Sequence, residues 1–296
     1  MDEQQWLAER FEQQRPRLRA VAYRMLGSLS EADDAVQEAW IRLSRSDSSE
    51  IENLDGWLTT VVARLSLNML RSRRTRREEP WGPRMPEPII DPASGVDPEH
   101  EALLADSVGL AMLVVLETLT PPERLAFVLH DMFGISFDEI APIVDRSPAT
   151  ARQLASRARR RVRGRAPEGE PDLKRQREVI GAFIAASREG DFDALVAVLD
   201  PDVVLRADSG PGVPPGASLE VRGAEAVASR ALSFSRMDLV AQPALINGAA
   251  GAVSLKDGEP FSIAAVTVRN GRIVELDFVS DPEILARLDL TLLDAG

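Results

Sequence analysis

Apolar side chains recur at helical spacing from Trp6 to Arg77, with almost no glycine or proline among the periodic positions. The pattern predicts one helix with an apolar stripe around 18–26 and a second over 31–43. It predicts a third from about Leu54 into the arginine-rich segment 71–77. We therefore expect an all-α module over residues 1–77.

The second of these helices has two distinct faces. The positions expected to face inward are Ala35, Val36, Ala39, Trp40 and Leu43. The other face carries Asp34, Gln37, Glu38 and Ile41, at i, i+3, i+4 and i+7. An acidic face is usually only solvated, but Ile41 has no place in the inner stripe. Spacing alone leaves a solvated surface and a protein-docking surface as equal alternatives.

Residues 78–98 interrupt the helical pattern with prolines and glycines, as is typical of a linker. Helical spacing resumes from about Glu99. Ser136 and Glu139 then form a Ser-x-x-Glu capping box, and a turn at 145–146 precedes a second cap at Ser147. This arrangement predicts a helix-turn-helix within residues 99–165.

The last helix of that motif has an apolar side and a basic side. The apolar side is formed by Ala151, Leu154, Ala158 and Val162. The other side carries donors that suit base edges near the helix start and phosphates farther along. These donors are Ser147, Thr150, Arg152, Gln153, Ser156, Arg157, Arg159, Arg160, Arg161 and Arg163. Most of these arginines have no acidic residue four positions away, so the pattern favours DNA contact over a salt-bridged surface.

Beyond a boundary at 164–171, helices are followed by strands. Amphipathic helices are expected over 173–189, 192–199 and 223–234, with a strand near 203–207. Strand-like runs follow near 239–246, 249–256, 260–269 and 272–280, with Asp257-Gly258 and Asn270-Gly271 as hairpin turns. We expect an α+β domain over 172–296, with a curved antiparallel sheet and helices against its concave side.

Charge adds a condition to the predicted DNA binding. The chain has 296 residues and a formal net charge of -12, which argues against non-specific nucleic-acid binding by the whole molecule. Two basic runs, 71–77 and 157–165, stand out from this background, which suggests local contacts that depend on a partner. The absence of cysteine excludes disulfides and thiolate metal sites, and we expect no cofactor. The polar N-terminus and the lack of a long apolar run predict a cytoplasmic protein.

These features together resemble a bacterial RNA polymerase sigma factor of the extracytoplasmic-function type. The segment 31–40, EADDAVQEAW, is similar to the family's signature for docking on the polymerase clamp helices. Trp57-Leu58 through Asn68 to Arg77 resembles the reader of the minus-ten element, and the segment 119–124, LTPPER, resembles the start of the minus-thirty-five module. The resemblance implies sigma region 2 over 1–77 and region 4 over 99–165.

The resemblance also implies core RNA polymerase and promoter DNA as partners. The polymerase-binding residues would be Asp33, Asp34, Gln37, Glu38 and Ile41. The DNA-binding residues of region 2 would be Asn53, Trp57, Asn68, Arg71, Arg73 and Arg74; those of region 4 would be Ser147, Thr150, Arg152, Gln153, Ser156, Arg157 and Arg160.

The loop 44–53 would hold a flipped base. Trp57 either packs in the core or stacks on a base. The chain has no Walker-type loop, in agreement with DNA opening without nucleotide hydrolysis.

Residues 172–296 resemble SnoaL-like members of the NTF2-like superfamily, through Ala182-Phe183, Gly190-Asp191, Ala194-Leu195 and the segment 200–203. Sigma factors with this fused domain form a SigJ-like group, in which the extension and the linker regulate the sigma modules in place of a separate anti-sigma protein. The group's linker motif, Trp-Leu-Pro-Glu-Pro, is matched at its last three positions. The implied regulatory contacts are Pro86, Glu87, Pro88, Asp208, Asp281 and Pro282.

The fold also occurs in isomerases and hydrolases, which makes catalysis an alternative. Both histidines, His100 and His130, and the only tyrosine, Tyr23, precede the third domain, which therefore lacks a His base and a Tyr donor. The remaining candidates are Asp208, Asp238, Asp277, Arg206 and Arg222, which are more often turn or sheet-edge residues. We expect no catalytic residue and a pocket that senses a small-molecule ligand.

Two rival functions stay open. One is a stand-alone helix-turn-helix regulator with a ligand-sensing domain, against which the acidic face and the second basic helix argue. The other is an NTF2-like enzyme with a helical appendage, against which the missing His and Tyr argue.

Overall fold

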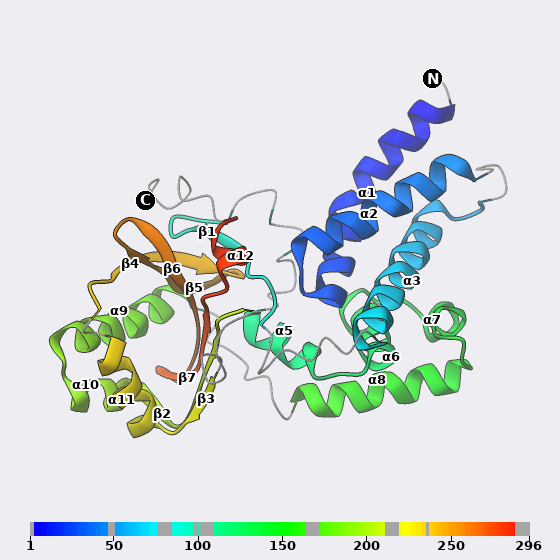
Figure 1. Ribbon diagram of the computed structural model, residues 1–296. Helices are drawn as coiled ribbons and strands as arrows, with labels where there is room; N and C mark the ends of the chain where they lie inside the picture. The colour runs from blue at the N-terminus through cyan, green and yellow to red at the C-terminus, as the bar shows by residue number, and fades with distance from the viewer. Residues whose placement is uncertain are drawn as a thin grey trace. The chain divides into compact units, whose positions relative to one another are not determined.

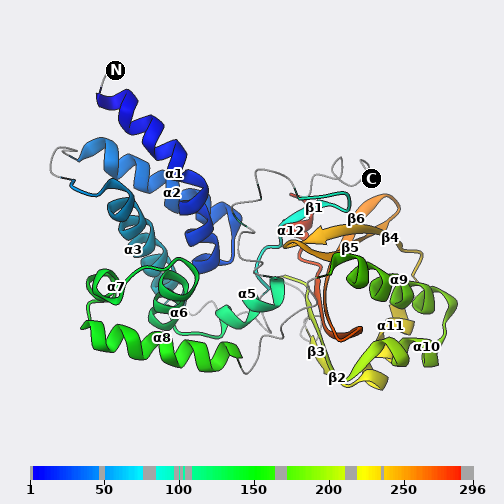
Figure 2. The same ribbon diagram turned by 180° about the vertical axis from the view of Figure 1, so that it is seen from behind.

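The computed structural model describes residues 3–46, 51–75, 85–96, 100, 103, 109–163, 172–210, 219–234 and 237–287 (Figures 1 and 2). The chain divides into two compact units. The first comprises Met1–Glu79, Pro98–Asp106 and Val115–Arg165; the second comprises Pro80–Asp97, Ser107–Val114 and Ala166–Gly296. The linker is thus grouped with the C-terminal domain. No helix in the described ranges is long and apolar enough to cross a membrane.

The first unit begins with the three predicted helices, α1 (Glu3–Leu26), α2 (Leu29–Arg45) and α3 (Leu54–Thr75). Local capping explains where two of them begin. The Ser28 hydroxyl accepts from the Glu31 N–H at the start of α2, and Asn53 Oδ1 accepts from the Gly56 N–H, 3.0 Å away, at the start of α3. The predicted inner positions of α2 are buried, except that Trp40 is half-buried and lies against Phe11.

The helix-turn-helix is confirmed. After α5 (Leu110–Glu117), the chain forms α6 (Pro121–Phe127), a π-helical turn η2 (Val128–Met132), α7 (Phe137–Val144) and α8 (Pro148–Arg163). The predicted Ser136–Glu139 capping box starts α7, and Asp145 ends it in the left-handed region, at φ 54°. The prediction for the apolar side of α8 was wrong at Leu154, which is half-buried, because Ala155 occupies the buried position.

The second unit is α+β, as predicted. The helices that lie wholly within it are α9 (Leu173–Glu189), α10 (Phe192–Val198), α11 (Ala224–Phe234) and α12 (Pro282–Leu285); the first part of α5 also belongs to it. Its strands are β1 (Ile90–Pro92), β2 (Leu199–Asp208), β3 (Leu219–Arg222), β4 (Val240–Ile246), β5 (Ala249–Lys256), β6 (Glu259–Arg269) and β7 (Arg272–Val279). They form one sheet in the order β1-β4-β5-β6-β7-β2-β3, antiparallel except between β2 and β7, which run parallel.

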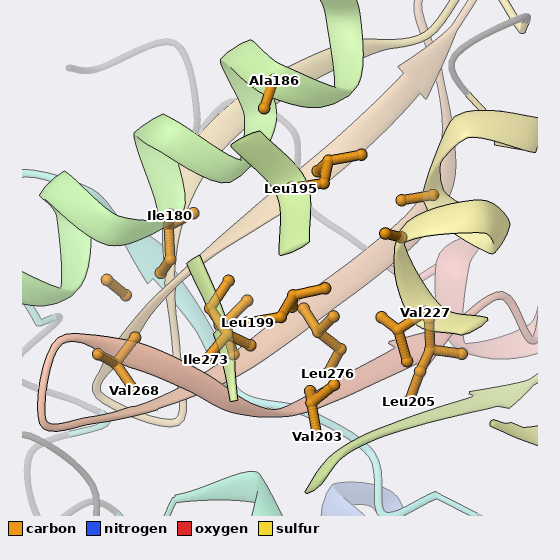
Figure 3. Close-up of a cluster of buried hydrophobic side chains, with 14 residues drawn as sticks. Ile180, Ala186, Leu195, Leu199, Val203, Leu205, Val227, Val268, Ile273 and Leu276 are labelled. Carbon is orange, nitrogen blue, oxygen red and sulfur yellow. The ribbon is translucent and has the colours of Figure 1, made fainter. Parts of the chain in front are cut away.

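Helices α9, α10 and α11 cover one face of this curved sheet (Figures 1 and 2). Side chains from the helices and from the sheet meet in a shared apolar core; Ile180, Leu195 and Val227 come from the helices, and Leu205 and Leu276 from the strands (Figure 3). Alternation along a strand sends the next residue of β2, Arg206, to the other face. The sheet therefore has a helix-covered face and an opposite face of different chemistry.

Candidate functional site

The predicted polymerase-binding face of α2 is only partly available. Asp34 and Gln37 are exposed and Ile41 is half-buried, as the helical spacing predicts. Asp33, however, accepts from Arg19 of α1, with Arg19 Nε 2.7 Å from Oδ1. Glu38 accepts from Arg42 one turn farther along, at 2.9 Å. An incoming partner finds Asp34 and Gln37 exposed and would have to compete for the other two carboxylates.

Helix α3 presents some of the predicted minus-ten residues to solvent and uses one internally. Asn68 and Arg71 are exposed, and Trp57 is half-buried. Asn53 is exposed but caps α3. Arg73 forms an ion pair with Glu31 of α2 and donates to the Leu26 carbonyl, 3.0 Å away, so its guanidinium ties α3 to the other two helices. The Arg74 side chain lies outside the described residues.

The donor face of α8 is largely free. Arg152, Gln153, Ser156, Arg157 and Arg160 are exposed. The Arg152 guanidinium lies 5.3 Å from the centroid of the Phe137 ring, which orients it near the helix start. Thr150 is half-buried, and the exposed Ser147 caps α8 by accepting from the Thr150 N–H, 3.3 Å away.

Two arginines of α8 do not match the prediction. Arg159 donates to Asp131 at 2.5 Å, and Arg161 donates to Glu123 at 2.7 Å. Sequence spacing reveals acidic partners only within the same helix, whereas the partners of these arginines come from η2 and α6. Both arginines therefore fasten α8 to its own module. The exposed donors outside these ion pairs lie nearer the helix start and at Arg160 and Arg163.

Two buried arginines join the helix-turn-helix module to the first module. Arg124 of α6 is 2% exposed and donates to the Leu116 and Met25 carbonyls, each at 2.8 Å; the latter belongs to the last turn of α1. Its ion pair with Glu117 spans 2.7 Å. Arg24, also 2% exposed, lies 4.8 Å from the Phe133 ring centroid. The two readers are thus packed against each other within one unit.

The linker is bound to the C-terminal domain along its described length. The Met85 N–H donates to Asp208 Oδ2, 2.7 Å away. Farther on, the Ile89 N–H donates to Asn247 Oδ1 at 3.2 Å, and the Ile89 carbonyl accepts from the Asn247 N–H at 2.8 Å. Strand β1 then pairs antiparallel with β4, Ile90 opposite Ile246. We call residues 85–92 the linker strap.

The predicted regulatory motifs gather around this strap. Pro86 and Pro88 are buried, and Glu87 forms an ion pair with Arg287 at 3.5 Å. Asp281 caps α12, of which Pro282 is the first residue. Only glycine fits at position 210. A Cβ there would lie 2.5 Å from the Asp281 carboxyl carbon, and the backbone has a positive φ of 79°.

The strap crosses the sheet on the face opposite the helices. Asp208 is the last residue of β2. Neighbouring side chains of a strand point to opposite faces, and Ala207 faces the helices, so the Asp208 carboxylate points to the other face. Ile90 is bound at β4, and β7, β6 and β5 lie between β2 and β4 in the sheet. The strap therefore spans most of the sheet's width, with Met85 and Ile89 buried.

The same face holds a cluster of charged side chains on β7, β2 and β3, toward one edge of the sheet. Arg206 donates to Asp277 at 3.0 Å and to Glu275 at 2.9 Å, and Glu220 approaches it within 3.6 Å. Burial, together with the charges of Glu275 and Glu220, raises the pKa of Asp277 to about 7, although Arg206 acts in the opposite direction. The residues of the predicted catalytic alternative, Asp-Arg-Asp chemistry, thus lie on the face away from the helices: Arg206, Asp208 and Asp277.

The raised pKa predicts a pH-dependent stability. Between pH 4 and 7, approximately, folded Asp277 keeps a proton that the unfolded chain releases, so the free energy of unfolding falls by up to about 1.4 kcal/mol per pH unit and then levels off. Asp277→Asn should remove this contribution, because an amide does not titrate. Urea unfolding at pH 5 and pH 8, followed by circular dichroism, compares the two proteins. If the free energy of unfolding changes equally with pH in both proteins, the raised pKa of Asp277 is contradicted.

Sequence comparisons agree with this organisation. Residues 10–76 match sigma-70 region 2, and residues 110–162 match sigma-70 region 4. The chain is 40% identical over 287 residues to the ECF RNA polymerase sigma factor SigJ of Mycobacterium tuberculosis, covering 92% of this chain and 91% of that protein. The chain belongs to the extracytoplasmic-function sigma factor family.

Other relatives extend the match beyond the sigma modules. A probable ECF sigma factor SigI of Mycobacterium tuberculosis is 35% identical over 268 residues, covering 90% of both chains. The crystal structure of Mycobacterium tuberculosis SigJ superposes with a TM-score of 0.75 at 36% identity, covering 94% of this chain and 98% of that one. The predicted fold class is confirmed: two all-α sigma modules precede an α+β domain with a curved, mostly antiparallel sheet.

Family membership settles the broad function. This sigma factor directs promoter-specific initiation of transcription, which sigma factors perform by binding core RNA polymerase and promoter DNA. The two rival functions are not favoured. His130 is packed within region 4, since its Nδ1 lies 2.9 Å from the Ile135 carbonyl oxygen and its ring lies against Phe137.

Sequence reasoning did not identify Asn247, Arg24 or Arg124 as site residues. Asn247 lies in a two-residue Asn-Gly turn, which in a sequence indicates only a hairpin. Arg124 belongs to the segment that resembles the start of region 4, but its acceptors lie on other helices.

Proposed function

We propose that the C-terminal domain regulates this sigma factor in cis by holding the linker between its two DNA-reading modules. The observation that carries the proposal is the linker strap, which is fixed at Asp208, at Asn247 and along β4. A bound strap shortens the length of free chain between regions 2 and 4. Regulation therefore acts on how far the two readers can separate.

Promoter geometry requires that separation. The minus-ten and minus-thirty-five elements lie about 25 base pairs apart, which is roughly 85 Å of duplex. Arg124 joins α6 to the end of α1, and Arg64 of α3 donates to the Pro142 carbonyl of α7 at 3.4 Å. Modules packed in this way cannot read both elements at once. We infer that the free protein is closed and opens on core polymerase.

The proposed contacts are those that the family resemblance implies, and exposure indicates which of them are accessible in the closed form. On the polymerase side we retain Asp33, Asp34, Gln37, Glu38 and Ile41, with Asp34 and Gln37 exposed in the closed form. On the DNA side we retain Asn53, Trp57, Asn68, Arg71, Arg73 and Arg74 for the minus-ten element, and Ser147, Thr150, Arg152, Gln153, Ser156, Arg157 and Arg160 for the minus-thirty-five element. Arg73 would first have to leave Glu31.

We also propose that the C-terminal domain is not an enzyme and that it acts without a separate anti-sigma protein, in the cytoplasm with the polymerase. Two observations support the first point. The catalytic candidates Arg206 and Asp277 lie on the face away from the helices, and Asp208 binds the strap. Arg222 pairs with Glu220, and Asp238 is exposed.

Run-off transcription with purified core polymerase tests the proposal. The full chain and residues 1–170 are compared on the same promoter panel. We expect both to direct initiation, with different yields, because only the full chain retains the domain that binds the strap. Identical yields would contradict regulation in cis. Failure of both on every promoter would contradict the sigma function itself.

Arg152→Ala and Arg157→Ala are expected to weaken binding to the minus-thirty-five element by about 1–3 kcal/mol if each side chain contacts a base edge. Binding of the polymerase complex to matched and base-substituted promoters measures the loss. Arg159→Ala is the control, since Arg159 is paired with Asp131. An equal loss on every sequence would identify a phosphate contact instead.

A further inference from the structure

A cavity of about 410 Å³ lies between the sheet and helices α9 and α11, on the face opposite the linker strap. Its apolar end is formed by side chains that Figure 3 shows between helix and sheet, among them Ile180, Leu205 and Leu276. The volume is within the range of small-molecule sites in proteins. The cavity therefore has room for a ligand with an apolar body.

The strand registers give the cavity floor a polar end. Ser254 of β5 lies opposite Ser262 of β6. Ile263 pairs with Val279, which sets Ser262 beside Ser280, and Asp208 pairs with Val279, which sets Ser209 beside Ser280. All of these serines line the cavity. They form one hydroxyl row across neighbouring strands, which we call the serine row.

The next rows along the strands are apolar. Ala252, Ala264, Phe278 and Ala207 form the row beside the serines, and Val266, Leu276 and Leu205 lie one row farther in. All of them line the cavity. A ligand that satisfies both ends must be amphipathic, with a group that accepts or donates hydrogen bonds at one end only.

Charge selects the kind of polar group. Among the described residues, the cavity lining contains two cationic side chains, Arg188 of α9 and Arg230 of α11, and neither aspartate nor glutamate. This differs from the chain as a whole, whose formal net charge is -12. A cationic head group would meet only like charge in this lining, whereas a carboxylate can accept hydrogen bonds from the serine hydroxyls and meets no like charge.

The serine row is next to the residue that binds the linker strap. Ser209 follows Asp208, whose side chain accepts from the Met85 N–H at 2.7 Å. Ser280 donates its backbone N–H to the Asp208 carbonyl, also at 2.7 Å. A ligand bound to Ser209 and Ser280 therefore acts on the backbone that positions the Asp208 carboxylate on the other face.

We propose that this cavity binds an apolar carboxylic acid of the fatty-acid or aromatic-acid class, and that its occupancy changes the hold of Asp208 on the linker strap. The apolar body lies over the alanine and leucine rows, and the carboxylate accepts from the serine row. The regulatory effect of the ligand rests on the proposed function in cis. Ligand binding does not rest on that function, and it can be measured without polymerase.

Calorimetric titration of the full chain with dodecanoate tests the binding. We expect one saturable site, with binding at least tenfold weaker for dodecyltrimethylammonium, which has the same chain and the opposite charge. Absence of a saturable site, or equal binding of the cation, would overturn the proposal.

Variants locate the site. Ala264→Leu fills the cavity floor and should abolish binding; Ala185→Leu makes the same change at an exposed position of α9 and should not. Ser262→Ala, which leaves the cavity open, should weaken binding about threefold to tenfold, and its control is the exposed Ser233→Ala. If controls and cavity variants behave alike, the cavity is not the site.

Hydrogen exchange of the full chain tests the coupling. Saturating dodecanoate should change the exchange rates of the Met85 and Ile89 amides at least severalfold, and Ala264→Leu should remove that change. Unchanged rates on a saturated protein would overturn the coupling. If binding and coupling hold while truncation leaves transcription unaltered, the proposed function fails and the ligand site stands.

Discussion

Arg124→Ala is expected to lower the free energy of unfolding of the helical unit by about 3 kcal/mol and to separate the two sigma modules. The substitution leaves the Met25 and Leu116 carbonyls without a buried donor and Glu117 without its cation. Urea unfolding followed by tryptophan fluorescence measures the first effect, because Trp40 and Trp57 both lie in region 2.

The separation can be measured by energy transfer between dyes. The chain has no cysteine, so Ser44→Cys and Ser156→Cys supply one attachment point on α2 and one on α8. Glu117→Gln is the matched control, since it removes the ion pair and keeps both carbonyl contacts of Arg124. If the variant and the control show the same dye separation as the parent, Arg124 does not hold the modules together.

The second large effect is expected at Asn247. Asn247→Ala removes the side-chain acceptor of the Ile89 N–H, which is buried and then lacks its partner, and should loosen the linker strap. Since the strap limits separation of the readers, run-off transcription should rise severalfold relative to the parent chain. The β4–β5 ladder, Val240–Ile246 with Ala249–Leu255, does not use the Asn247 side chain, so the domain retains its hairpin.

Asn270→Ala serves as the control. It changes the same residue type at the same left-handed conformation, φ 53° against 50° for Asn247, but in the β6–β7 turn, outside the strap contacts. The free-energy cost of placing alanine in the left-handed conformation is therefore the same in the variant and in the control. If both variants raise transcription equally, general loosening of the domain is responsible and the strap is not the regulator.

The helix-turn-helix and its caps could be predicted because their determinants are local. Ser136 and Glu139 are three residues apart, and Asp145 ends α7 within the same segment. The hairpins of the last domain were predictable for the same reason, since Asp257-Gly258 and Asn270-Gly271 adopt the required positive φ.

Contacts between distant segments could not be predicted in this way. Ile90 pairs with Ile246, and nothing in the proline-rich composition of residues 78–98 indicates a strand. The parallel pairing of β2 with β7 and the ion pairs of Arg159 and Arg161 likewise join residues far apart in the chain. Periodicity identifies which side of a helix is polar, but not which tertiary partner its polar groups find.

Strand β1 has a consequence for the topology of region 4. The sheet takes β1 from before the helix-turn-helix and all its other strands from after it, so region 4 is an insertion within the C-terminal domain. The chain enters region 4 from β1 and leaves it toward α9, so region 4 is connected to the C-terminal domain at both of its ends and forms a closed loop. Release of β1 would convert this loop into a single tether at the C-terminal end, and would join regions 2 and 4 by free chain instead.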